Sequence, residues 1–258
     1  MVGISRLYCK TVSPSDPLRY GRQSSRLPSG TGLFSADCKP IVVFNCTRRC
    51  NLRCIHCYSA STSVADPDEL TTDEAAALLD DLADFGAPVV LFSGGEPLLR
   101  EDLPGLVARA RDKGLRAVVS TNGTLIDARA ARKLAEAGTN YVGVSLDGLA
   151  EANDTFRGVP GAFEKALAGM RRCRDAGIKV GLRLTMTRDN VGELPAVFDL
   201  IEREEIGRAC FYHLVASGRG GALADRVLSH ERTRQAVDLI IDRTVALHRS
   251  GRPIEVLT

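Results

Sequence analysis

The chain has 258 residues, a size typical of single-domain α/β barrels, and its composition of 44% hydrophobic and 26% charged residues is that of a globular protein. No apolar run approaches the roughly 20 residues that a membrane-spanning helix needs, and the net charge of +2 comes with no basic-aromatic array, so we expect no membrane span and no nucleic-acid partner. The N-terminus has no secretory signal pattern, which predicts a cytoplasmic protein. The eight cysteines therefore favour metal binding or catalysis over disulfides.

Residues 1–38 are rich in Ser, Pro, Gly and Arg and have weak periodicity, which predicts an irregular N-terminal arm laid over a domain at 39–258. Within that domain, apolar runs alternate with amphipathic helical stretches. The expected strands cover residues 41–45, 88–92, 116–120, 141–146, 179–186 and 209–215. Six βα units predict parallel strands in an α/β fold, either a doubly wound sheet or a full or partial barrel. The chain ends in a further short β-like run, PIEVLT.

The helical stretches carry recognisable start and stop signals. Thr71 and Glu74 have capping-box spacing, and Cys173 lies on an apolar helix face, where we expect a small core residue. A glycine precedes each strand after the first, at a position where a helix end favours a left-handed residue. These glycines are Gly86, Gly114, Gly138, Gly177 and Gly207.

Four cysteines lie in the stretch CTRRCNLRCIHCYS after the first expected strand. Cys50, Cys54 and Cys57 form CxxxCxxC, in a loop short enough to place three thiolates around one inorganic group. A structural zinc site needs four protein ligands, and the one nearby candidate for a fourth, Cys46, sits at the strand end. The pattern favours a 4Fe-4S cluster with one open iron over zinc or a closed cluster, with Cys46 outside the ligand set.

Small and polar motifs follow the next three strands, at the edge where parallel α/β folds bind ligands. In SGGEP, Gly94 and Gly95 would let the backbone approach a ligand, or would simply form a tight turn. In SLDG, Ser145 suits a carboxylate and Asp147 a ribose diol, with a plain turn as the alternative. Asn122 in STNG either contacts a ligand or caps the helix after it.

Together, CxxxCxxC, GGEP and SLDG closely resemble the radical S-adenosylmethionine (SAM) superfamily over roughly residues 39–215. The resemblance implies a partial, six-stranded (β/α)6 barrel, cluster ligation by the three cysteines of the motif, and SAM chelated by the open iron. It also implies SAM contacts: His56 against the adenine, Gly94, Gly95 and Glu96 at the methionine amino end, Ser145 at its carboxylate, and Arg183 near the carboxylate or ribose. Reductive cleavage of SAM would yield a 5'-deoxyadenosyl radical.

The arm sequence and the segment LFSADCKPIVVFNC add a narrower resemblance, to 12,18-didecarboxysiroheme deacetylases and their relatives in haem d1 synthesis. This implies an iron tetrapyrrole substrate, removal of two acetate side chains to give Fe-coproporphyrin III, and an electron donor such as ferredoxin or flavodoxin. The arm arginines become candidate partners of substrate carboxylates: Arg6, Arg19, Arg22 and Arg26.

Two features depart from that group. Its members extend into a cysteine-containing C-terminal region, often with a second 4Fe-4S cluster, which this chain does not include, and Asn153 stands where many relatives have His. Two other functions share parts of the pattern: a radical SAM peptide maturase, and a non-catalytic iron-sulfur or zinc binding module. Peptide maturases usually carry a winged N-terminal module, so the arm favours the tetrapyrrole enzyme.

Overall fold

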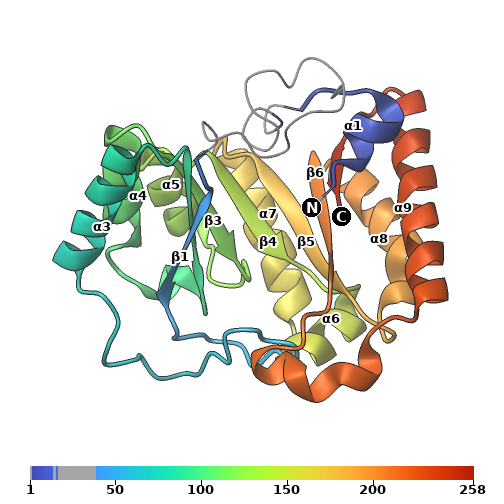
Figure 1. Ribbon diagram of the computed structural model, residues 1–258, viewed down its shortest axis with the longest axis horizontal. Coiled ribbons are helices and arrows are strands. Elements are labelled where there is room, and N and C mark those ends of the chain that lie inside the picture. Colours follow the sequence, from blue (N-terminus) through green and yellow to red (C-terminus); the bar gives the residue numbers. More distant parts are fainter. Residues whose placement is uncertain (1, 14–15, 17–38) are drawn as a thin grey trace.

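The computed structural model describes residues 2–13, 16 and 39–258, and in this part of the chain seven parallel strands form one curved sheet with helices packed on its outer face (Figure 1). The strands are β1 (Val42–Thr47), β2 (Val89–Gly94), β3 (Arg116–Thr121), β4 (Tyr141–Ser145), β5 (Val180–Met186), β6 (Arg208–His213) and β7 (Glu255–Leu257). The helices are α1 (Ile4–Cys9), α3 (Thr72–Phe85), α4 (Leu103–Asp112), α5 (Ala128–Glu136), α6 (Ala150–Arg157), α7 (Ala162–Asp175), α8 (Leu194–Arg203) and α9 (His230–Arg249). Short 3-10 segments cover η1 (Pro97–Leu99), η2 (Val191–Glu193) and η3 (Gly218–Arg226).

The strand order separates the two architectures that remained open from the sequence. Neighbouring strands follow the chain order from β1 to β7 without a reversal. A doubly wound sheet has a point where the order reverses, so this sheet is an open, partial barrel. All six expected strands are confirmed, and the short run at the chain end adds β7, parallel to β6.

Successive side chains along each strand point alternately toward the helices, where they form the core, and toward the interior of the barrel. On β5, Leu182, Leu184 and Met186 are fully buried toward the helices, while the side chain of Arg183 lies on the inner face. Polar side chains can therefore line the interior without entering the hydrophobic core. Cys173 is fully buried in that core, as expected.

Most helix signals are confirmed. Thr71 and Glu74 form the complete capping box of α3, and Gly86, Gly114, Gly138 and Gly177 have φ between 81° and 86°. The expectation for Gly207 is wrong: the left-handed residue after α8 is Glu205, with φ of 52°, because α8 ends earlier and its turn closes before the glycine.

The arm is not irregular throughout. α1 packs against α9 and β7, and Gly3 forms an antiparallel bridge with Leu257. Burial of Ile4 explains this helix, whose apolar contacts are too few to show as a periodic pattern. α1 lies at the opposite end of the barrel from the loop that follows β1 (Figure 1). Within the described residues, no helix has the length and apolar character to cross a membrane.

Candidate functional site

The structure separates Cys46 from the other three cysteines of the motif. Cys54 is buried in a small cluster with Leu52, and partly buried Cys50 and Cys57 pack against it. Cys46 lies in the main core instead, 2% exposed, with its thiol donating to the carbonyl oxygen of Ser93 at 3.3 Å. Burial raises the pKa of the Cys46 thiol to about 12. Cys46 is therefore a strand residue of the core, as inferred from the sequence.

The three remaining thiols have different surroundings. Burial raises the pKa of Cys50 to about 11. Burial also acts to raise the pKa of Cys57, but hydrogen bonds from Ser59 and Ser61 outweigh it and lower that pKa below its ordinary value. The Cys54 sulfur accepts a hydrogen bond from Arg157 Nη1 at 3.6 Å. All three face polar donors, which suits thiolates.

Two segments distant in sequence hold the cysteine loop. At the end of α6, the carbonyl oxygens of Phe156 and Arg157 accept hydrogen bonds from the amides of Ile55 (3.0 Å) and Arg53 (3.1 Å). From η3, the Arg219 guanidinium donates to the carbonyl oxygens of Cys54 (2.8 Å) and Ser61 (2.6 Å). Sequence reasoning missed both arginines; Arg157 belongs to NDTFRG, in which only Asn153 drew attention, and Arg219 has no local signal.

Asp147 does not lie in an open mouth as expected. It is fully buried, and its carboxylate forms an ion pair with Arg157, lies 3.3 Å from His56 Nε2 and accepts from the Thr185 amide at 2.8 Å. Buried carboxylates need such partners, since desolvation would otherwise favour the neutral acid. Its backbone amide donates to Asn153 Oδ1 at 3.0 Å. Asp147 thus ties the β4 loop to α6 and the cysteine loop, and contact with a ribose is not supported.

His56 lies between these groups. Its ring packs against Phe156, with centroids 4.9 Å apart, and its side chain is 12% exposed. Burial lowers the pKa of His56, and although Asp147 acts to raise it, Arg157 and Arg219 add to the lowering. The expected contact of the imidazole with adenine stays a prediction.

The SGGEP turn approaches the cysteine loop directly. The amides of Gly95 and Glu96 donate to the carbonyl oxygens of Thr47 (2.7 Å) and Arg49 (2.8 Å). A Cβ at Gly95 would lie 2.8 Å from the Arg49 carbonyl carbon, so only glycine permits the approach. The Gly95 amide is therefore already paired within the protein, and contact of Gly94 and Gly95 with a ligand stays a prediction.

Glu96 joins the SGGEP turn to the STNG loop. Its carboxylate is fully buried and accepts hydrogen bonds from Thr121 Oγ1 at 2.7 Å and from the Asn122 amide at 2.8 Å, as well as from the Leu98 amide. Burial nevertheless raises the pKa of Glu96 to about 7. Glu96 thus positions the two turns, and its expected contact with the methionine amino group stays a prediction.

Asn122 closes the turn after β3 and contacts the cysteine loop. Its Oδ1 accepts from the Thr124 amide at 2.9 Å, and its Nδ2 donates to Asn51 and lies 3.9 Å from Cys50 Sγ. It does not cap the helix after it, because the side chain of Asp127 caps α5. Contact of Asn122 with a ligand stays a prediction.

The two remaining predicted residues lie on adjacent strands at this end of the barrel. Ser145 ends β4, half-buried, and Arg183 beside it on β5 donates to Ser120 Oγ inside the barrel. Their roles in SAM binding stay predictions.

The arm arginines are not part of this site in the described residues. Arg6 is 7% exposed and forms an ion pair with Asp16 at 3.3 Å, on a helix at the opposite end of the barrel. This does not support Arg6 as a partner of substrate carboxylates. Arg19, Arg22 and Arg26 lie outside the described residues.

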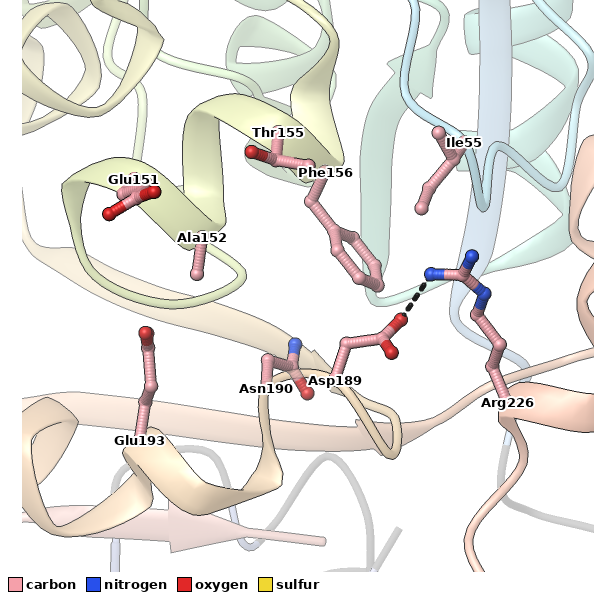
Figure 2. A pocket seen from close by; sticks show the side chains of 9 residues that line it. All are labelled: Ile55, Glu151, Ala152, Thr155, Phe156, Asp189, Asn190, Glu193 and Arg226. Carbon is pink, nitrogen blue, oxygen red and sulfur yellow. Dashed lines mark hydrogen bonds and ion pairs between the residues drawn. The ribbon is translucent and has the colours of Figure 1, made fainter.

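A separate cavity of about 320 Å³ lies beside the site, between α6 and the start of α8 (Figure 2). The cavity adjoins the site through Ile55 and Phe156, and through Asn190, whose Nδ2 donates to the carbonyl oxygen of Asp147 at 2.9 Å. Its charged lining is mainly acidic: Glu151, Asp189 and Glu193, with Arg226 bound to Asp189 at 2.6 Å. None of the three cysteines lines it.

Comparison with known proteins assigns the family. The sequence profile of the Radical SAM superfamily matches residues 44–201. The chain belongs to the radical SAM superfamily. The family resemblance of the cysteine, GGEP and SLDG motifs is thereby confirmed, and the family implies a 4Fe-4S cluster and SAM as cofactors.

Relatives within this radical SAM family are similar over most of the chain. It is 60% identical over 258 residues to the Fe-coproporphyrin III synthase of Methanosarcina barkeri, covering 100% of this chain and 65% of that protein. It is 46% identical over 221 residues to the pre-heme d1 synthase of Dinoroseobacter shibae, covering 85% of this chain and 55% of that protein. The chain thus spans less than two thirds of the length of either relative. A solved structure of native anSMEcpe with bound AdoMet matches 84% of this chain and 63% of that one, with a TM-score of 0.70 and 19% identity, which supports the fold.

The donor set fits the cluster that the radical SAM family implies. Three thiols share one loop, with the partly buried Cys50 and Cys57 packed against the small cluster that contains Cys54. A buried guanidinium beside Cys54 suits the negative charge of a thiolate-bound cluster. Cys50, Cys54 and Cys57 are therefore the residues that would hold it.

Proposed function

We propose that this chain is the radical SAM unit of an enzyme that acts on an iron tetrapyrrole, removing two acetate side chains of 12,18-didecarboxysiroheme to give Fe-coproporphyrin III. The observation that carries the proposal is the 60% identity to a protein named Fe-coproporphyrin III synthase, which extends over all 258 residues, the arm included. The haem d1 relative supports the same substrate class.

The chain's own residues would hold and shield the cofactors. Cys50, Cys54 and Cys57 would ligate the cluster, and the backbone of Gly94 and Gly95 with Ser145 and Arg183 would hold the methionine end of SAM. When bound, these cofactors would supply a 5'-deoxyadenosyl radical through one-electron reductive cleavage of SAM. The packed loop around Cys54 would exclude water from this chemistry.

The substrate would enter from the inner face of the barrel. A polycarboxylate is poorly matched to the acidic cavity of Figure 2. A ferredoxin or flavodoxin would supply the electron in a cytoplasmic setting, and a second 4Fe-4S cluster would belong to a region outside these 258 residues.

Anaerobic reconstitution tests the proposal in two stages. With iron, sulfide, dithionite and SAM, the protein is expected to be brown and to release 5'-deoxyadenosine, measured by chromatography. Adding 12,18-didecarboxysiroheme is expected to yield Fe-coproporphyrin III, detected by mass. A colourless zinc protein, or a cluster indifferent to SAM, would overturn the radical reaction; SAM cleavage without any change in the tetrapyrrole would overturn the substrate alone.

A further inference from the structure

Arg157 is a buried cation in direct contact with a predicted cluster ligand. It ends α6, is 8% exposed, and points its guanidinium into the space between the cysteine loop and the β4 loop. One terminal nitrogen donates to Cys54 Sγ at 3.6 Å, and the other forms an ion pair with Asp147. Holding a charge in such a place is costly unless partners compensate it, so its position is specific.

Asp147 fixes the direction of this guanidinium. The carboxylate is itself held by the Thr185 amide at 2.8 Å and has 1% side-chain exposure. His56 Nε2 lies 3.3 Å from the carboxylate oxygen that pairs with Arg157. Arg157 and Asp147 form a buried ion pair, in which the guanidinium of Arg157 also contacts the Cys54 sulfur.

The three thiols differ in the donors that they meet. In the described part of the chain, Cys50 accepts from the Leu52 amide at 3.4 Å, and Cys57 interacts with the Ser59 hydroxyl at 3.4 Å, both neutral groups. The donor to Cys54 is charged. Charge-assisted hydrogen bonds are stronger than neutral ones, and hydrogen bonds to ligand sulfur are among the factors that set the potential of an iron-sulfur cluster.

We propose that Arg157, oriented by Asp147, raises the reduction potential of the cluster by donating a charged hydrogen bond to Cys54 Sγ. The inference rests on the proposed cluster but not on the tetrapyrrole substrate. Reduction adds negative charge to the cluster and its thiolates, so a nearby guanidinium stabilises the reduced form more than the oxidised form. Arg157 is a positioning residue in this scheme, because it acts through Cys54.

The test is a potentiometric titration of the reconstituted protein, followed by electron paramagnetic resonance without SAM or substrate. Arg157→Met is expected to move the midpoint potential to a more negative value, and Arg157→Lys to restore part of the difference. Arg219→Met is the matched control, because Arg219 holds the same loop through the carbonyl oxygens of Cys54 and Ser61. It is expected to lower iron content and to shift the potential of the loaded fraction less than Arg157→Met does, because the Arg219 guanidinium donates to backbone carbonyl oxygens and not to a ligand sulfur.

The double variant Arg157→Met/Asp147→Asn covers the case in which Arg157→Met alone fails to bind iron, since it removes the carboxylate that would be left buried without its cation. A wild-type potential in either loaded Arg157→Met protein, or an equal shift in Arg219→Met, would overturn the inference. Failure of every Arg157 variant to bind iron would also overturn it, in favour of a purely structural role. A wild-type protein that forms no cluster would instead contradict the proposed function.

Discussion

Buried polar side chains organise this site at the scale of single residues. Asp147, Glu96 and Arg157 are each almost completely removed from solvent, yet each joins two or more loops through hydrogen bonds or ion pairs. Such groups are costly unless they are satisfied, so they hold the loops in one arrangement. Most of the motif residues that were expected to contact a ligand hold neighbouring loops together instead.

The cysteines give the first prediction at this scale. Cys54→Ser is expected to lose the cluster, because it removes one of three thiolate ligands, whereas Cys46→Ser is expected to retain it, because Cys46 lies in the core and contacts Ser93. Iron and sulfide content and visible absorption after anaerobic reconstitution measure both. Loss of the cluster in Cys46→Ser at unchanged thermal stability would show that Cys46 is a ligand after all.

Glu96 gives a prediction on pH. Its native pKa of about 7 lies above the ordinary 4.5, so the native state prefers the protonated acid. The stability from this preference is fully present below pH 4.5 and is lost as the pH rises through about 7. The shift of the Glu96 pKa corresponds to about 3 kcal/mol in the free energy of unfolding. Glu96→Gln is expected to remove this loss of stability at higher pH.

Urea unfolding of the reduced, metal-free protein at pH 5 and pH 8 measures the effect. Glu101→Gln is the control, because Glu101 is exposed and should leave the pH dependence as in the wild type. An identical pH dependence in wild type and Glu96→Gln would contradict the prediction.

At the scale of elements, the ends of strands and helices meet around the cysteine loop. The β2 turn approaches it through backbone hydrogen bonds from Gly95 and Glu96, and α6 contributes the carbonyl oxygens of its last two residues. Gly158, with φ of 69°, follows α6, and a Cβ there would lie 2.8 Å from the Arg53 carbonyl oxygen. Glycines at these ends allow backbone to meet backbone without side chains between.

Gly95→Ala tests this close approach. The added methyl would clash with the Arg49 carbonyl, so we expect about 2 kcal/mol lower stability and reduced cluster loading. Gly105→Ala is the matched control within α4, since a Cβ there meets no atom within 4 Å and alanine favours a helix. Thermal unfolding and iron content measure both; full loading and normal stability in Gly95→Ala would exclude a tight contact.

At the scale of the whole molecule, the partial barrel places its polar loops at one end and the N-terminal helix at the other (Figure 1). β7 lies beside β6, and Val2 and Thr258 exchange backbone hydrogen bonds at its far side. The two ends of the described chain thus stabilise each other, away from the cysteine loop.

Val256→Ala tests this arrangement. Val256 is fully buried on β7, so its truncation is expected to cost about 2 kcal/mol and to speed hydrogen exchange in α1, while leaving cluster loading unchanged. Val215→Ala, at a position 64% exposed, should have little effect on either measurement. If Val256→Ala lowers the stability of the protein but leaves hydrogen exchange in α1 unchanged, α1 does not depend on β7.

The sequence by itself determined the βα alternation, the positions of six strands, the capping box at Thr71 and the three-cysteine motif, because these depend on local periodicity and spacing. Tertiary structure decided that the sheet is an open barrel, that Cys46 is in the core, and that Asp147 and Glu96 are occupied by protein partners. It also brought Arg157 to Cys54, 103 residues away. Contacts between distant segments depend on how strands and helices pack, and no short pattern in the sequence encodes them.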